Sequence, residues 1–181
     1  AGPHLGNEAL LGRDRLPDRF AYHDYVEVED KAALVADVKD RIRAIVASGS
    51  SGGADADLIN SLPNLEMIAV MGVGYNTIDV EAAKARGIPV TNTPDVLTDC
   101  VADLGMALML GIARRVVEGD GYVRAGDWVA KGVMRYGARI TGKRLGIVGL
   151  GRIGLAIAKR AEGFGMEISY QGPNKKDAPY V

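Results

Sequence analysis

The sequence has 181 residues, of which 48% are hydrophobic and 25% are charged. These proportions are ordinary for a globular protein, and the length allows one domain or two small ones. The formal net charge is −1 and there is no basic stripe, which argues against a nucleic-acid partner. The longest apolar run, 104–113, is too short to span a bilayer and predicts a buried helix instead.

Two features predict a cytoplasmic protein. The N-terminus lacks the charged and then apolar leader of a secreted protein. The single cysteine, Cys100, cannot form an internal disulfide, which fits a reducing compartment. Cys100 could act as a nucleophile or as a buried thiol, and its position beside an acid at the start of an apolar helix favours the thiol.

Short apolar strands alternate with helical segments along the chain, the pattern of an α/β protein with parallel sheets. The first half predicts strands at 43–47, 67–71 and 88–91 and helices at 57–62 and 79–86. Asp79 is expected to cap the second helix, and Gly87 to end it in the left-handed conformation. Strand 67–71 is apolar on both faces, as a sheet covered on both sides requires.

The pattern changes at 92–95, which we interpret as a hinge. The second half predicts helices at 96–115, 116–125 and 153–164, strands at 145–148 and 166–170, and a loop from Trp128 to a turn at 141–143. We therefore expect one domain over 1–92 and another over 93–181.

The predicted fold class is two Rossmann-like or flavodoxin-like parallel-sheet domains, both incomplete in this chain. Residues 1–5 read as the exit of a strand that would precede them. Strand 166–170 is only the second of a fold that has about six.

The segment 144–154 predicts a buried strand that runs into Gly-x-Gly-x-x-Gly and then into a helix. Gly149 allows the tight turn, Gly151 lets the backbone approach a pyrophosphate, and Gly154 lets helix and strand pack closely. Backbone amides at the helix start would face the anion. The flanking strand and helix favour a dinucleotide site over a mere packing turn. The predicted contacts are Gly149, Leu150, Gly151, Arg152, Ile153 and Gly154.

The end of the next strand indicates which dinucleotide is preferred. NAD enzymes place an acid there to bind the ribose hydroxyls, whereas this chain has Gly172, Pro173, Asn174 and Lys175. An acid about 4 Å from a 2′-phosphate would cost roughly 1–4 kcal/mol, so its absence favours NADP over NAD. Asn174, Lys175 and Arg152 are the candidate donors. Glu167, at the strand's beginning, is expected to face solvent. The alternative is that Lys175 and Lys176 only form a solvated loop.

Together these segments resemble the D-isomer-specific 2-hydroxyacid dehydrogenases, especially the glyoxylate/hydroxypyruvate reductase branch. The resemblance covers nearly the whole chain. It is carried by the glycine turn and by segments 62–66, 72–79, 86–94, 101–104, 124–128 and 142–143.

This resemblance implies an active site between a substrate domain, 1–92, and a cofactor domain, 93–181. The backbone amides of Val73 and Gly74 would hold the substrate carboxylate. The alternative is that Gly72 and Gly74 only shape a turn. The loop 48–53 would face the same cleft, and Thr98 would lie near the nicotinamide.

The resemblance also implies a homodimer, formed by the helix from Val96 and the arm through Trp128. The plain alternative for Trp128 is core packing. The family's chemistry uses an arginine, a glutamate and a histidine that lie beyond the point where this chain ends, and neither His4 nor His23 matches that motif. We therefore assign no catalytic acid–base residue, and no metal ligand, in this segment.

The predicted function is NADPH-dependent reduction of a small 2-keto acid such as glyoxylate or hydroxypyruvate. The alternative is a non-catalytic NAD(P)-binding regulatory or interaction module of the same fold. Segment 49–53 also fits the Gly-x-Ser-x-Gly of α/β-hydrolases, but that fold needs a histidine after the serine and none follows His23. Phosphoglycerate and formate dehydrogenases share the glycine turn, and the NADP-like loop argues against both.

Overall fold

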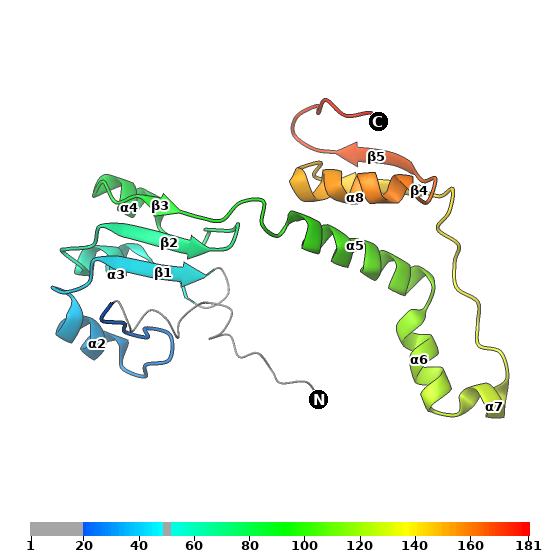
Figure 1. Cartoon of the computed structure of the whole chain (residues 1–181), viewed down its shortest axis with the longest axis horizontal. Coiled ribbons are helices and arrows are strands. Elements are labelled where there is room, and N and C mark those ends of the chain that lie inside the picture. Colours follow the sequence, from blue (N-terminus) through cyan, green and yellow to red (C-terminus); the bar gives the residue numbers. More distant parts are fainter. Residues whose placement is uncertain (1–19, 49–51) are drawn as a thin grey trace. The chain divides into compact units, whose positions relative to one another are not determined.

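The structure, a computed structural model, describes residues 20–48 and 52–181. The chain divides into two compact units, unit 1 over Ala1–Thr93 and unit 2 over Pro94–Val181 (Figure 1). Each unit contains helices and one parallel sheet. The division falls next to the boundary expected near Asn92. The strand exit expected at 1–5 lies outside the described residues.

Over its described residues, unit 1 contains a three-stranded parallel sheet, with one helix before the first strand and one helix in each connection between strands. The strands are β1 (Ala44–Ser48), β2 (Met67–Met71) and β3 (Val90–Thr91), in that order across the sheet, and the helices are α2 (Lys31–Val38), α3 (Ala56–Ser61) and α4 (Val80–Ala85). The sequence predicted every one of these elements except α2, although β3 is shorter than expected. The apolar residues of α2 form no clear stripe, and Val38 is its one buried residue.

Aspartates begin all three of these helices. Asp30, Asp55 and Asp79 each accept a hydrogen bond from the third backbone amide of the helix that follows, at 2.8–2.9 Å. Gly87 follows α4 with φ +68°, in the left-handed conformation. The predicted start and end of α4 are therefore confirmed.

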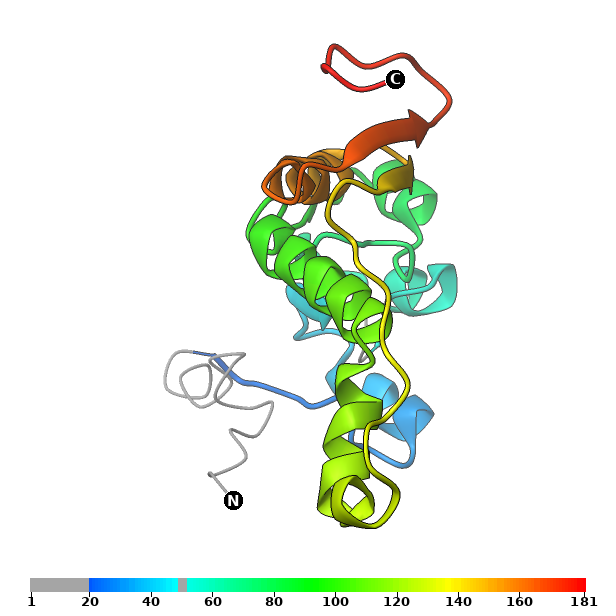
Figure 2. The same ribbon diagram turned by 90° about the vertical axis from the view of Figure 1, so that its right-hand side faces the viewer.

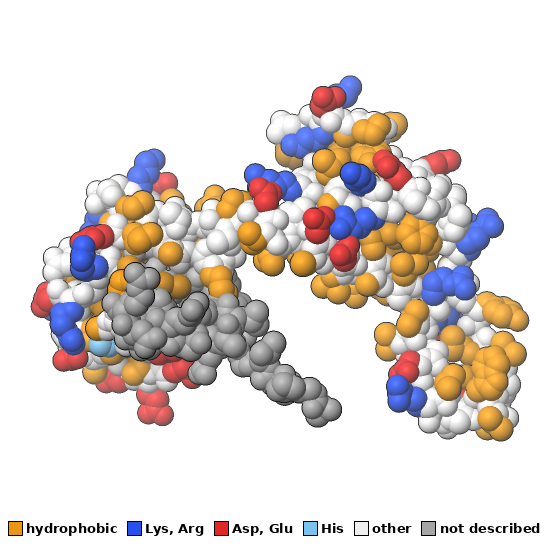
Figure 3. All heavy atoms as spheres, viewed as in Figure 1, with side chains coloured by type: hydrophobic (Ala, Val, Ile, Leu, Met, Phe, Trp, Pro, Cys, Tyr) orange, Lys and Arg blue, Asp and Glu red, His pale blue; other side chains and the backbone are white. Residues whose placement is uncertain are grey.

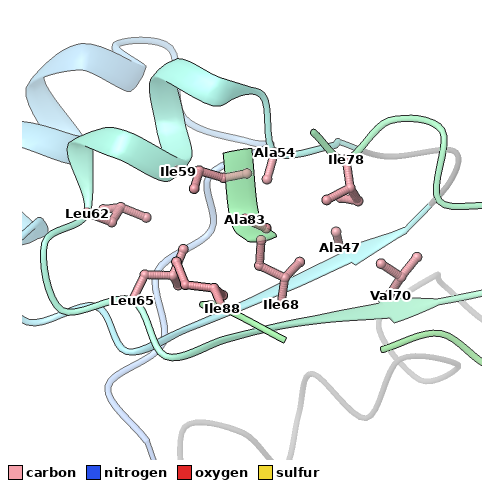
Figure 4. Close-up of a cluster of buried hydrophobic side chains, with 10 residues drawn as sticks. All are labelled: Ala47, Ala54, Ile59, Leu62, Leu65, Ile68, Val70, Ile78, Ala83 and Ile88. Atoms are coloured by element: carbon pink, nitrogen blue, oxygen red, sulfur yellow. The ribbon is translucent and has the colours of Figure 1, made fainter. Parts of the chain in front are cut away.

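The core of unit 1 lies between the sheet and helices α3 and α4 (Figure 4). Ile68 of β2 and Ile59 of α3 are its largest fully buried side chains. The other face of β2 is different, because Met67 and Met71 remain 38% and 42% exposed. The expectation that both faces would be covered is therefore wrong for the part of the chain that the structure describes. The helices packed on β2 cover only the face of Ile68 and Val70.

Arg86 ties the end of α3 to the end of α4. Its guanidinium donates to the carbonyl oxygens of Ile59, Leu62 (2.9 Å) and Pro63 (3.1 Å). We expect Arg86→Met to lower the free energy of unfolding by about 1–3 kcal/mol, because part-buried carbonyls lose their donors. Denaturant unfolding measures this change. Arg43→Met, which removes an exposed ion pair with Glu66, is the control and should cost less; equal losses would contradict the prediction.

Unit 2 combines a two-stranded parallel sheet with four helices over its described residues. Its elements are α5 (Thr98–Ala113), α6 (Val116–Arg124), α7 (Asp127–Lys131), β4 (Arg144–Val148), α8 (Arg152–Glu162) and β5 (Glu167–Gln171). Helix α8 packs against β4 and β5, and α5 packs against α8. After α7 the chain returns in extended form (Figure 2). On the way, Ala138 N–H donates to the carbonyl oxygen of Ala113 at 2.7 Å.

Arg160 joins α8 to the first turns of α5. Its guanidinium lies 2.6 Å from the Asp103 carboxylate and 3.0 Å from that of Asp99. These two hydrogen-bonded carboxylates, Asp103 first, raise the pKa of Arg160 above its ordinary value. These two ion pairs hold α5 against α8.

Three expectations for unit 2 are wrong. Trp128 lies in α7 rather than in a loop, and at 55% exposure it is not a core residue. Cys100 is exposed rather than buried. The apolar run of α5 is not a buried helix, because Leu104, Leu108 and Ile112 are 57–80% exposed. Helix α8 occupies only the side of α5 that carries Ala102 and Met106.

Hydrophobic side chains consequently gather on the surface of helices α5 to α7 (Figure 3).

None of the helices described is both long and apolar enough to cross a membrane. Among residues 20–48 and 52–181, no three His, Cys, Asp or Glu side chains are grouped so that they could hold a metal ion.

Candidate functional site

The glycine turn of unit 2 joins the end of β4 to the start of α8. Gly149 has φ +91°, a conformation that side chains rarely adopt, and Gly151 is the extended residue just before α8. No side chain caps this helix, and its first turn has no acidic residue. The first backbone amides of a helix have no partner within it, and the helix dipole places partial positive charge there. This helix start can therefore receive an anion.

The glycines of this turn differ in the space around them. A Cβ on Gly154 would lie 2.3 Å from the carbonyl oxygen of Gly149 and 3.2 Å from the Ile147 side chain, so helix and strand pack too closely for any side chain. A Cβ on Gly151 would meet nothing within 4 Å. Gly154 thus serves the fold, whereas the space over Gly151 is open to a ligand. These surroundings fit the pyrophosphate of a dinucleotide.

The loop after β5 lies beside the glycine turn. Gly149 N–H donates to the carbonyl oxygen of Gln171 at 2.8 Å, so the two loops leave the same edge of the sheet. The backbone amide of Lys176 donates to the Tyr170 hydroxyl at 2.8 Å, which closes the loop that holds Gly172, Pro173, Asn174 and Lys175. Glu167 is the exposed first residue of β5, as predicted.

Thr98 is connected to the glycine turn through Asp95. Thr98 N–H donates to the Asp95 carbonyl oxygen at 3.1 Å, and the Asp95 carboxylate lies 2.8 Å from Nε of Arg152. Asp95 has φ +71°, which is uncommon for a residue other than glycine. The structure therefore brings Thr98 and Arg152 together, as one dinucleotide site would require. The sequence offered no sign that Asp95 links them.

A second candidate site lies in unit 1, in the loop after β2. Gly72 has φ +131°, and its N–H donates to Oγ1 of Thr93 at 2.9 Å. Thr93 N–H donates to the Gly72 carbonyl oxygen, and the Asn92 side-chain amide donates to the Val73 carbonyl oxygen, both at 2.9 Å. No hydrogen-bond acceptor for the N–H of Val73 or Gly74 is found in the described part of the chain. These two free amides can bind an anion.

The sequence pattern pointed to Val73 and Gly74 in this site but not to Asn92 or Thr93. Asn92 and Val73 are separated by eighteen residues of chain, and only the adjacency of β2 and β3 brings them together. The polar pair Asn92–Thr93, directly after a short strand, could have indicated this part of the site. The carboxyl ends of neighbouring parallel strands meet at one edge of a sheet.

The loop after β1 is only partly described. Residues 49–51, which carry most of the possible hydrolase motif, lie outside the described residues, as does His4. Gly53 lies against the loop after β2, because a Cβ there would be 2.0 Å from the Thr77 carbonyl oxygen. Ala54 also forms a parallel bridge with Ile78. The loops after β1 and β2 thus lie side by side.

The chain belongs to the D-isomer-specific 2-hydroxyacid dehydrogenase family. The sequence model described as the catalytic domain of D-isomer specific 2-hydroxyacid dehydrogenases matches residues 10–168. The resemblance found from the motifs is therefore confirmed, and so is the fold class of parallel-sheet α/β domains.

Three relatives show how far this likeness extends. A glyoxylate/hydroxypyruvate reductase A of Arabidopsis thaliana is 45% identical over 92% of this chain and 53% of its own length. A hydroxyphenylpyruvate reductase of Plectranthus scutellarioides is 47% identical over 87% and 49%. An NADPH-dependent glyoxylate/hydroxypyruvate reductase of Sinorhizobium meliloti, crystallised with NADP and malonate, is 39% identical, with a TM-score of 0.82 over 93% and 52%. The chain thus spans about half the length of the curated relatives it matches.

Proposed function

We propose that the protein reduces a small 2-keto acid, such as glyoxylate or hydroxypyruvate, with NADPH. One observation is the main support for this proposal. An uncapped helix start, whose own first turn has no acidic residue, lies at the same sheet edge as a loop that bears Asn174 and Lys175 where NAD enzymes carry an acid. The pyrophosphate and the 2′-phosphate of one NADPH would be bound by these neighbouring loops.

Unit 2 would bind the dinucleotide. The turn from Gly149 to Gly154 would hold the pyrophosphate, with Leu150 and Ile153 contributing backbone. The Arg152 guanidinium, which is paired with Asp95, would contribute its remaining N–H groups. The loop from Gly172 to Lys175 would surround the 2′-phosphate, and Thr98 would lie near the nicotinamide. When bound, NADPH supplies the hydride.

Unit 1 would bind the substrate. The amides of Val73 and Gly74 would receive its carboxylate, since two adjacent free N–H groups match the two oxygens of that group. The carbonyl also needs a proton donor, and the family resemblance assigns that role to residues beyond this segment.

The resemblance suggests a homodimer, and the single cysteine suggests a reducing compartment. The exposed apolar side chains of α5 to α7 support a homodimer formed through this surface, because a second copy would remove them from water. We place the protein in the cytoplasm. The relatives named above are reductases, which supports an enzyme over a non-catalytic module of the same fold.

The cofactor claim is tested by titrating the full-length protein separately with NADPH and NADH and following the fluorescence of the bound dinucleotide. We expect NADPH to bind at least about tenfold more tightly, since one phosphate–lysine contact accounts for a kilocalorie or more. Equal or tighter binding of NADH would contradict the proposal.

Initial rates with several keto acids then test the reaction. We expect turnover of glyoxylate or hydroxypyruvate, with hydroxyphenylpyruvate as the bulky comparison. Tight NADPH binding without turnover of any of the three would favour the non-catalytic alternative.

A further inference from the structure

The backbone of the loop after β2 is held from one side by two consecutive residues, Asn92 and Thr93. Three hydrogen bonds of 2.9 Å join the segments. The first two connect Gly72 to Thr93 in both directions, and the third runs from the Asn92 side chain to the Val73 carbonyl oxygen. We call Asn92 and Thr93 together the backbone clamp.

The clamp acts on the two peptide groups that carry the free amides. A trans peptide is planar, and its C=O and N–H point in opposite directions. Thr93 holds the carbonyl of the Gly72–Val73 peptide, whose N–H belongs to Val73. Asn92 holds the carbonyl of the Val73–Gly74 peptide, whose N–H belongs to Gly74. With both carbonyls fixed on the clamp side, both N–H groups must face the other way.

The conformation of Gly72 makes this arrangement possible. Its φ of +131° is a value that other residues rarely adopt, and a Cβ there would meet nothing within 4 Å. Glycine is therefore needed for the backbone angle rather than for space. A glycine hinge is also free to rotate, so the orientation of the next two peptides depends on the hydrogen bonds that hold them.

We propose that Asn92 and Thr93 are positioning residues for the substrate carboxylate. They would not touch the substrate but would aim the amides of Val73 and Gly74 at it before it binds, which lowers the ordering cost of binding. A carbonyl that accepts a hydrogen bond also makes the N–H of its own peptide a better donor. This inference rests on the proposed binding of a keto acid by these amides.

Asn92→Ala in the full-length protein tests the clamp. The probe is oxalate, a carboxylate that cannot accept a hydride, titrated against the protein saturated with NADPH. We expect oxalate to bind about three- to tenfold more weakly, the effect of one lost hydrogen bond. KM for the keto acid should rise by a similar factor, whereas kcat and the dissociation constant of NADPH should change less than about twofold.

Asn64→Ala is the matched control. The Asn64 side-chain amide also donates to a backbone carbonyl oxygen of unit 1, that of Asp40, at 2.8 Å, but it lies outside the loop. Thr93→Val is a second variant. It keeps the Thr93 N–H bond to the Gly72 carbonyl oxygen but removes the oxygen that accepts the Gly72 N–H, so the glycine hinge is less restrained and oxalate binding should weaken. Thr93→Ser should restore binding. Thr93→Val and Thr93→Ser still test the clamp if Asn92→Ala does not fold.

The outcomes separate the two proposals. Oxalate affinity unchanged in Asn92→Ala and Thr93→Val, or lowered equally in Asn64→Ala, would overturn the clamp and leave the proposed function intact. A wild-type protein that binds NADPH but neither oxalate nor a keto acid would overturn both.

Discussion

Gly151→Ala is expected to lower the affinity for NADPH by about ten- to a hundredfold while leaving the fold intact. The added methyl group would occupy the space through which the pyrophosphate approaches the backbone, and overpacking of this kind costs about 1–3 kcal/mol. The protein itself can accept alanine there, because no atom lies within 4 Å of the new Cβ and the backbone is extended, with φ −85°. Calorimetric titration with NADPH measures the loss.

The thermal midpoint of Gly151→Ala should stay close to that of the wild type, which distinguishes a blocked ligand from a damaged fold. Gly154→Ala provides the contrast within the same turn. Its Cβ would lie 2.3 Å from the Gly149 carbonyl oxygen, so α8 must move away from β4 and stability should fall by about 1–3 kcal/mol or more. NADPH binding unchanged in Gly151→Ala would place the pyrophosphate elsewhere.

Lys175→Glu is expected to weaken NADPH binding by about ten- to a hundredfold and NADH binding by less than about threefold. The change replaces an attraction for the 2′-phosphate with a repulsion, and a charge pair about 4 Å apart is worth roughly 1–4 kcal/mol near a protein surface. NADH has no phosphate at that position, so it should be affected only by the general change in charge. Titrations with each dinucleotide measure the ratio of the two dissociation constants.

Lys159→Glu is the control for Lys175→Glu. It makes the same change in net charge on an exposed residue in the last turn of α8, whereas the glycine turn lies at the first turn of that helix. Its effect on both dinucleotides should be small and should decline with added salt. Equal losses of NADPH and NADH affinity in Lys175→Glu would contradict the assignment and support the solvated-loop alternative.

The features best predicted from the sequence are those that depend on residues close together along the chain. Strand β2, the Asp79 cap, the Gly87 end and the glycine turn each rest on a local pattern of apolar residues, a capping side chain or a glycine. Helix α2 escaped prediction because its apolar residues lack a clear stripe, so its position depends on packing.

The errors concern which side chains are covered. Cys100 and the outer side of α5 were expected to be buried, and core packing was the alternative for Trp128, yet hydrophobicity alone does not say which neighbour covers a residue. The same limit applies to the candidate sites. The contacts of Asn92 with Val73 and of Asp95 with Arg152 join distant parts of the chain, and no local pattern announces them.

The buried cluster of unit 1 has a consequence for how the chain folds. All its members lie between Ala47 and Ile88, and they are joined by parallel pairs of consecutive strands. Each parallel pair closes a loop of about twenty residues, which makes its formation slow, but none of these contacts needs a residue of unit 2. Every residue of this cluster has been synthesised before the first residue of unit 2. We therefore expect unit 1 to condense around it during translation, while the dinucleotide corner has yet to be made.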